Sequence, residues 1–216
     1  MDNLITISYF KAGIIISNLS DAKAFPVDYI AKYQKQYLIK SLGYAMYKDF
    51  ETELAKEEVD IPQIWKDLRD GADYNVTVNG ATTLTRWNGF INTEEVSPIS
   101  NFVYYWYLRQ NNTQLMGIGT GIPDKENATS VSPAQKLTSA WNDYIILTGN
   151  LKDYVNGSYY VDINRYRNNK YHGDDLSFID DTVTLDESLF MYLYHHREDF
   201  TNWIFTNDIK INTLGI

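Results

Sequence analysis

Residues 102–108 read Phe-Val-Tyr-Tyr-Trp-Tyr-Leu, a run that is apolar or aromatic at every position. Ser97-Pro98 precedes the run and is typical of a helix start, so the sequence predicts a helix here. A helix on the surface of a protein has a polar face, and this one has none. We therefore expect it to be covered on nearly every side. It is either the central helix of its own domain, which is the favoured reading, or it is covered by a neighbouring subunit.

Helices are also predicted on both sides of this run. Apolar residues recur at helical spacing in two blocks that Gly43 separates: Tyr29, Ile30, Tyr33, Tyr37 and Leu38 after Pro26, and Tyr44, Tyr47, Phe50 and Leu54 up to about Glu58. Pro62 begins a short helix that Gly71 ends. Ser132-Pro133 begins a later helix that we expect to continue to Gly157, and Asp186 is expected to cap a last one.

The remaining segments predict strands and loops. Residues 73–90 alternate in hydrophobicity around Asn79-Gly80, which is the strongest short signal for a type I′ turn, so a small β-hairpin is predicted there. Residues 111–131 form a long polar loop, and residues 155–185 look like a variable insertion. Residues 1–25 are expected to form an extended arm with short strand character, and Ile209–Ile216 an extended tail.

Together these segments predict one domain over residues 1–216 that is mainly α. We expect a helical bundle of about four or five helices with an inserted β-hairpin and extended termini. No stretch of about 18 apolar residues is present, so neither a membrane span nor association with a membrane is expected. No signal peptide is expected either, because Lys11 follows the first apolar stretch rather than preceding it.

Composition narrows the classes of function. Cysteine is absent, which excludes disulfides, thiolate metal sites and cysteine nucleophiles. The formal charge is −9 and Lys and Arg do not cluster, so tight binding to a nucleic-acid backbone is not expected. An acidic surface suits a channel through which DNA slides, although most acidic proteins have no such role. The aromatic content is 15%, with 18 Tyr and 5 Trp, which is typical of a large interface or of a sugar site.

No pattern in the sequence completes a catalytic, cofactor or metal site. His195 and His196 are adjacent and would point about 100° apart on a helix, and the loop Tyr171–Asp175 is read as a solvated acidic loop rather than a cation site. Gly117–Gly121 resembles a phosphate cradle, but it follows a helix instead of a strand. No Gly-x-Ser-x-Gly motif marks a hydrolase nucleophile. We therefore expect no enzyme activity, no cofactor and no metal.

Several segments resemble a family of uncharacterised proteins from phages and prophages of Bacteroides-like bacteria, including crAss-like phages. The similarity is carried by Ser97–Asn111 with Gly117-Ile118-Gly119, Leu42–Phe50, Trp65–Gly71, Trp87–Phe90, Asn127, Ser132-Pro133, Ala140–Asn142 and Leu214–Ile216. It covers most of the chain up to about residue 150 and then only the last few residues. Residues 155–185 resemble nothing in that family.

The resemblance implies a structural protein of the virion: an adaptor, or ring protein, of the head-to-tail connector in the neck of a tailed phage. Such adaptors are mainly helical, dock near the portal, and often form rings of twelve copies around the channel for genomic DNA. The implied place is the virion neck or tail, after assembly in the cytoplasm of the bacterial host. The resemblance implies no catalytic residue at any position of this chain.

The residues expected to contact partners follow from this reading. Trp106 and Arg109 are candidate interface anchors, because Trp and Arg dominate interface hot spots, although Trp106 is slightly more consistent with plain core. The remaining candidates lie in the long loop and in the tail: Gly117, Ile118, Gly119, Ile209, Ile211, Leu214 and Ile216. The tail either adds a strand to a neighbouring subunit or folds back on its own domain. The alternative function is a tail-associated module that binds carbohydrate or a receptor.

Overall fold

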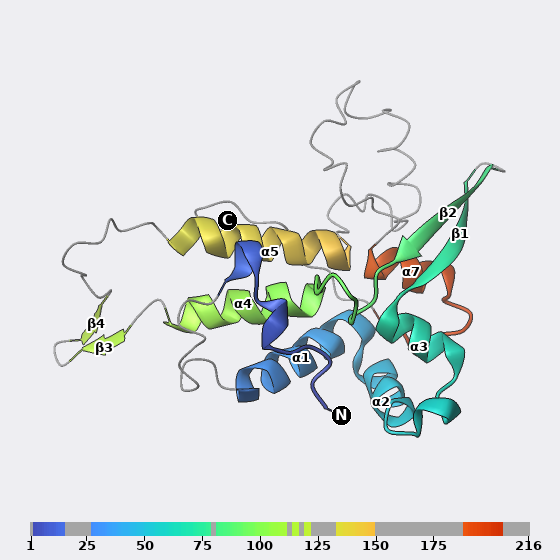
Figure 1. Cartoon of the computed structure of the whole chain (residues 1–216), viewed down its shortest axis with the longest axis horizontal. Coiled ribbons are helices and arrows are strands. Elements are labelled where there is room, and N and C mark those ends of the chain that lie inside the picture. Colours follow the sequence, from blue (N-terminus) through green and yellow to red (C-terminus); the bar gives the residue numbers. More distant parts are fainter. Residues whose placement is uncertain are drawn as a thin grey trace.

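The structure is a computed structural model, and it describes residues 2–15, 27–78, 81–111, 114–116, 119–121, 133–149 and 188–204. This part of the chain is mainly helical with a two-stranded antiparallel hairpin, which confirms the predicted fold class (Figure 1). In chain order, the elements are the 3-10 turns η1 (Ile7–Tyr9) and η2 (Ala12–Ile14), helices α1 (Val27–Leu42) and α2 (Tyr44–Glu53), the 3-10 turn η3 (Glu58–Asp60), helix α3 (Gln63–Asp70), strands β1 (Ala72–Val78) and β2 (Ala81–Trp87), helix α4 (Pro98–Asn111), strands β3 (Gln114–Met116) and β4 (Gly119–Gly121), and helices α5 (Pro133–Thr148) and α7 (Leu189–His195).

The aromatic helix α4 is the central helix of the chain's own core. It packs between α1 and α5 (Figure 1). Its side chains from Ile99 to Tyr105 are buried, whereas Trp106, Tyr107 and Leu108 are half-buried. The favoured reading of the run is therefore confirmed, and the helix becomes more accessible toward its C-terminal end.

Gly43 separates α1 from α2 as predicted. Its φ is +80°, a left-handed conformation that glycine adopts without a steric penalty. The predicted continuation of α2 to about Glu58 is wrong, because the helix ends at Glu53. The buried side chains of α2 are Met46, Tyr47 and Phe50, and Leu54 just after the helix still packs against the core. Residues 55–58 are exposed, so no further apolar side chain extends that face.

The predicted hairpin is confirmed, and it stands against the end of α3. One face carries Tyr74 and Val76, which are buried, while Leu84 on the other face is 68% exposed. The predicted turn at Asn79-Gly80 lies outside the described residues. At the base of the hairpin, the Trp87 indole N–H donates to the Leu68 carbonyl at 2.9 Å, which fixes β2 against the last turn of α3.

Several predicted element boundaries are corrected. Helix α5 ends at Thr148 rather than near Gly157, because Gly149, with φ +103°, terminates it. The N-cap of α7 is Ser188 rather than Asp186, and its hydroxyl accepts a hydrogen bond from the Met191 amide at 3.3 Å.

Two predicted extended segments are also corrected. Within residues 2–15, the N-terminal arm forms the 3-10 turns η1 and η2 and no strand. The expected loop at residues 111–131 contains the short antiparallel pair β3–β4, whose register joins Leu115 to Thr120. The expected insertion at residues 155–185 and the tail Ile209–Ile216 lie outside the described residues.

Within the described ranges, none of the helices combines the length and the apolar composition that a membrane crossing requires.

Candidate partner interface

The start of α1 and the end of α4 meet in a network of aromatic and amide side chains. The Tyr29 hydroxyl donates to Gln110 Oε1 at 2.6 Å, and Gln110 Nε2 donates to the Tyr33 hydroxyl. Tyr29 also packs edge-on against Tyr107, with 6.0 Å between ring centroids. These contacts hold the start of α1 and the end of α4 together. Gln110 is exposed and Tyr29 and Tyr107 are half-buried at this surface, whereas Tyr33 is buried.

Two cations lie on the aromatic rings of this surface. The rings of Tyr33 and Trp106 stack with an interplanar angle of 3° and 5.8 Å between centroids. The Lys32 ammonium lies 5.0 Å from the centroid of Tyr33, and the Arg109 guanidinium lies 5.2 Å from that of Trp106. We call Lys32, Tyr33, Trp106 and Arg109 the cation–aromatic cluster. Such contacts are worth about 0.5–1 kcal/mol each at exposed sites.

Trp106 combines the two roles that the sequence left open. Its ring packs against Phe102 in the core, with 6.2 Å between centroids, and is half-buried overall. Its indole N–H is covered and has no hydrogen-bond acceptor in the described part of the chain. Arg109 is exposed and donates to the Tyr105 hydroxyl at 3.3 Å. Trp106 is thus the inner edge of the cluster, and Arg109 is its exposed outer edge.

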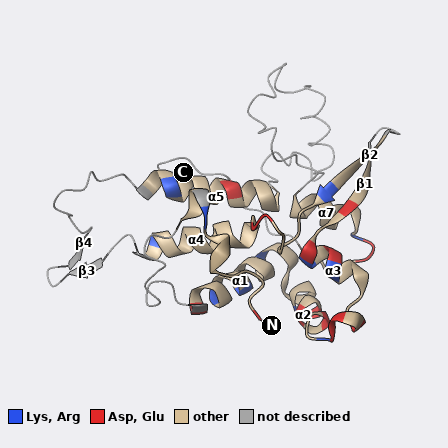
Figure 2. Ribbon diagram, in the orientation of Figure 1, with Lys and Arg blue, Asp and Glu red and all other residues tan. Residues whose placement is uncertain are grey.

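A second charged surface lies beyond the other end of α1. Between residues 48 and 70 the sequence has eight Asp and Glu against four Lys and Arg, and Figure 2 shows acidic residues along α2 and α3. We call residues 48–70 the acidic lobe. At its tip, η3 has no buried residue, and Val59 is 86% exposed between Glu58 and Asp60.

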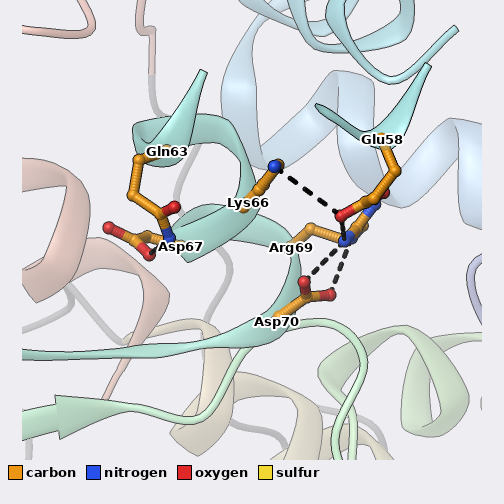
Figure 3. Close-up of polar contacts among 6 residues, drawn as sticks. All are labelled: Glu58, Gln63, Lys66, Asp67, Arg69 and Asp70. Atoms are coloured by element: carbon orange, nitrogen blue, oxygen red, sulfur yellow. Dashed lines mark hydrogen bonds and ion pairs between the residues drawn. The ribbon is translucent and has the colours of Figure 1, made fainter. Parts of the chain in front are cut away.

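The basic residues of the acidic lobe are engaged within it. Arg69 forms two hydrogen bonds of 2.9 Å with the Glu58 carboxylate and also pairs with Asp70 at 2.6 Å, as Figure 3 shows. Lys56 pairs with Glu53 at 2.6 Å, and Lys48 pairs with Glu51. Glu57 and Asp60 have no ion pair among the described residues. The lobe therefore presents surplus negative charge at its tip.

These ion pairs shift the pKa values of the carboxyl groups. Hydrogen bonding to Arg69 lowers the pKa of Glu58 below its ordinary value. Hydrogen bonds from Lys48 and then from Tyr47 lower the pKa of Glu51 to about 2. Burial, and the hydrogen bond to Glu51, raise the pKa of Tyr47 to about 12. The lowered pKa values of Glu51 and Glu58 favour their ionised carboxylates, whereas the raised pKa of Tyr47 keeps its hydroxyl protonated.

The other predicted contact residues are not brought together by the described structure. Gly119 begins β4, where it pairs with Met116. Gly117, Ile118, Ile209, Ile211, Leu214 and Ile216 lie outside the described residues. The structure thus supports a surface around Trp106 and Arg109 and leaves the loop and the tail as predictions.

His195, the last residue of α7, and its C-cap His196 both lie beside an aromatic ring of the hairpin. The ring centroids of His195 and His196 are 5.8 and 5.7 Å from that of Tyr74. In the described ranges, no group of three or more potential ligands is arranged to hold a metal ion. The loop around His172 lies outside those ranges.

Sequence reasoning missed the contribution of α1 to this surface. Tyr29, Tyr33 and Tyr37 follow one another at helical spacing, and this pattern correctly predicted a helix. Nothing in that spacing shows that Tyr33 stacks on Trp106, because the pairing depends on how α1 and α4 cross. The lysine at position 32, next to a tyrosine, was the one local signal of a cation on an aromatic ring.

Comparisons of the chain with protein-family models, with curated proteins and with solved structures found no match. The resemblance to the phage family therefore stays a prediction, and the functional reading depends on the surfaces described above.

Proposed function

We propose that this chain is a non-enzymatic structural subunit of a tailed phage virion, a ring-forming adaptor of the head-to-tail connector that docks near the portal. The proposal joins the family resemblance of the sequence to the cation–aromatic cluster at the α1–α4 end. Copies of the chain surround the channel for genomic DNA and contact one another and the neighbouring neck proteins.

The cation–aromatic cluster is the observation that carries the proposal. Trp, Tyr and Arg are the residues that supply most of the binding energy in protein interfaces. Tyr33 is buried, at 2% exposure, and Gln110 donates a hydrogen bond to its hydroxyl. The half-buried Trp106 stacks on this fixed ring, so little side-chain entropy of Trp106 remains to be lost on binding. Arg109 adds an exposed charge at the edge of the rigid rings. The surface is thus preorganised for a partner that brings apolar and acidic groups.

The surface charge supports the channel part of the proposal. The chain carries a formal charge of −9, and its basic residues in the acidic lobe are engaged with carboxylates. Phosphate binding requires free clusters of Lys and Arg. The exposed cations of the cation–aromatic cluster are taken up by contacts with partner proteins in this proposal, so such a subunit does not attract the DNA backbone strongly. DNA would therefore pass such a ring without being retained.

The test is assembly with a phage portal. The purified chain, alone and mixed with the portal of a crAss-like phage, is examined by native mass spectrometry and negative-stain electron microscopy. We expect closed rings of this chain coaxial with the portal. A chain that neither joins the portal nor forms a ring would contradict the proposal, and quenching of its Trp fluorescence by soluble oligosaccharide would then favour the carbohydrate-binding alternative.

Replacing the two cations tests the role of the cluster itself. Lys32→Ala combined with Arg109→Ala removes both charges without opening the core, since both side chains are exposed. We expect fewer rings and a weaker association by about tenfold or more, because the double variant removes two anchors. Lys11→Ala with Arg86→Ala is the matched control: it removes the same charge from exposed residues elsewhere and should leave assembly unchanged.

A further inference from the structure

Surplus charges of opposite sign lie at the two ends of the described body. Figure 2 shows acidic residues along α2 and α3, and basic residues on α1 and at the opposite end of α4. Helix α1 has 16 residues, about 24 Å at 1.5 Å per residue. The cation–aromatic cluster is near the start of α1, and the acidic lobe follows its end. From Lys32 to Leu42 the helix rises about 15 Å, and α2 and α3 lie at the end of the described body opposite the C-terminal end of α4 (Figure 2). The two surfaces therefore face different sides of one copy of the chain.

The basic surface has no acidic partner in the described part of its own chain. Lys32, Lys35 and Arg109 are exposed, and none of them belongs to an ion pair there. Asp28 is the only carboxylate in α1, and it forms no ion pair with Lys32. On a chain with a formal charge of −9, this end is a local exception.

The tip of the acidic lobe complements this surface in charge and in polarity. Glu57 and Asp60 are exposed carboxylates without ion pairs among the described residues. They lie two residues before and one residue after Val59, which is 86% exposed. The tip therefore presents an apolar side chain between negative charges. The cation–aromatic cluster presents the half-buried ring of Trp106 between positive charges, so the two surfaces match in both respects.

We infer that the tip of the acidic lobe of one copy, Glu57–Asp60, docks on the cation–aromatic cluster of the next copy. In this contact Val59 packs on the accessible edge of the Trp106 ring, and the two carboxylates lie near the cations of the cluster and near Lys35. The inference rests on the proposed function and names the neighbour that the cluster binds. Because the two contacting surfaces differ, the contact is heterologous, and such a contact forms a ring when the rotation between successive copies closes.

Site-directed cross-linking tests the geometry of the contact. The chain has no cysteine, so an introduced cysteine is the only thiol in each variant and every cross-link comes from the chosen position. A Val59→Cys chain is mixed with a Lys35→Cys chain that carries a mass tag, with the portal present, and a short bismaleimide is added. We expect the mixed link between positions 59 and 35 to exceed the link of either variant to itself. Leu84→Cys, on the exposed face of the hairpin, is the control position and should link to neither.

Charge reversal tests the chemistry of the contact. Glu57→Lys with Asp60→Lys should weaken association by about tenfold or more, and Lys32→Glu with Lys35→Glu should restore it when the two variants are mixed. The control is Glu94→Lys with Glu198→Lys, which changes the net charge equally at exposed residues outside both surfaces. Association of the wild-type chain should also weaken as salt is added.

The outcomes separate this inference from the proposed function. In one case, rings form on the portal while each cysteine variant links mainly to itself; in another, rings form while charge reversal has no effect on association. Either result overturns the inference and leaves the proposed function standing. Absence of rings and of every cross-link overturns both. Mixed links together with rescue by the paired reversal support the head-to-tail contact.

Discussion

At the scale of single residues, two glycines determine how the hairpin joins α3. Gly71 and Gly89 have φ values of +91° and +80°, and each lies very close to backbone atoms of the other segment. A Cβ on Gly89 would lie 2.4 Å from the carbonyl carbon of Asp70, and one on Gly71 would lie 2.5 Å from the Trp87 carbonyl oxygen. Neither position has room for a side chain, so the base of the hairpin requires both glycines.

The first prediction concerns Gly89. Gly89→Ala should lower the free energy of unfolding by more than ~2 kcal/mol, because alanine is strained at positive φ and also clashes with backbone atoms. Urea denaturation followed by Trp fluorescence measures this change. Gly13→Ala is the control, since a Cβ there meets nothing within 4 Å, and should change stability by less than ~0.5 kcal/mol. Equal effects of the two substitutions would refute the close approach.

The sequence predicted one of these two residues. Gly71 follows a helical stripe and was expected to end a helix, which it does. The role of Gly89 depends on contact with residues 69–71, about twenty positions earlier in the sequence, and no local pattern reveals it. Trp106 and Arg109 were likewise named from residue type, but the partner ring of Tyr33 became visible only from the packing of α1 on α4.

At the scale of elements, η3 is held on α3 by an ion pair rather than by burial. No residue of η3 is buried, and Glu58 receives two hydrogen bonds of 2.9 Å from Arg69 (Figure 3). Arg69 lowers the pKa of Glu58 in the folded protein. The pair therefore stabilises the fold at pH values above 4.5, the ordinary pKa of a glutamate. The stabilisation is lost as the pH falls below 4.5 and through the lowered pKa.

The second prediction follows from that pair. Glu58→Gln should lower the melting temperature at pH 7 and reduce the further loss of stability between pH 5 and pH 2, since the carboxylate that titrates there is gone. Thermal unfolding by circular dichroism at a series of pH values measures both effects. Glu57→Gln changes the same charge one residue away without breaking an ion pair and should have little effect at pH 7. A parallel response of the two variants would argue against the role of the pair.

The first residues of helices were predictable where a proline marks them, whereas the last residues of helices were harder to predict. Pro98 and Pro133 begin α4 and α5 as predicted, because proline suits the first helical turn. The end of α5 was placed at Gly157, although Gly149 is the residue in the left-handed conformation. Gly149 and Gly157 both follow the helical stripe in the sequence. The packing of Gly149 beside Phe190, which no sequence pattern reveals, shows that Gly149 ends the helix.

At the scale of the whole molecule, the N-terminal arm connects distant parts of the chain. The Tyr9 hydroxyl accepts a hydrogen bond from the Asn92 amide at 3.1 Å and donates to the Asn92 carbonyl at 3.3 Å. Lys11 pairs with Glu95 at 2.8 Å, and the Leu4 amide donates to Gln34 on α1 at 2.7 Å. The arm thus joins α1 to the segment that leads into α4.

The third prediction tests this connection. Tyr9→Phe keeps the buried ring and removes both hydrogen bonds, so the free energy of unfolding should fall by about 1–2 kcal/mol. Chemical denaturation provides the value. Tyr44→Phe makes the same chemical change at a side chain that is 65% exposed and should be nearly neutral. If Tyr9→Phe were also neutral, the arm would not be held by these bonds.

The fold class was predictable from the sequence as a whole, because helical spacing, proline starts and one hairpin signal agree with each other. The placement of opposite charges at the two ends of the molecule could not be predicted from the sequence. The acidic lobe is visible in the sequence as a dense run of carboxylates, but its placement opposite the cluster follows from the direction of α1 between them. Tertiary arrangement, rather than local pattern, produces the two complementary ends.

The most direct test of the proposed connector role is an electron cryo-microscopy reconstruction of the neck of a tailed phage that encodes this chain. We expect density for α4 between α1 and α5, repeated in a ring coaxial with the portal, with the tip of each acidic lobe against the next copy. A neck reconstructed at similar quality without this chain would contradict the connector role.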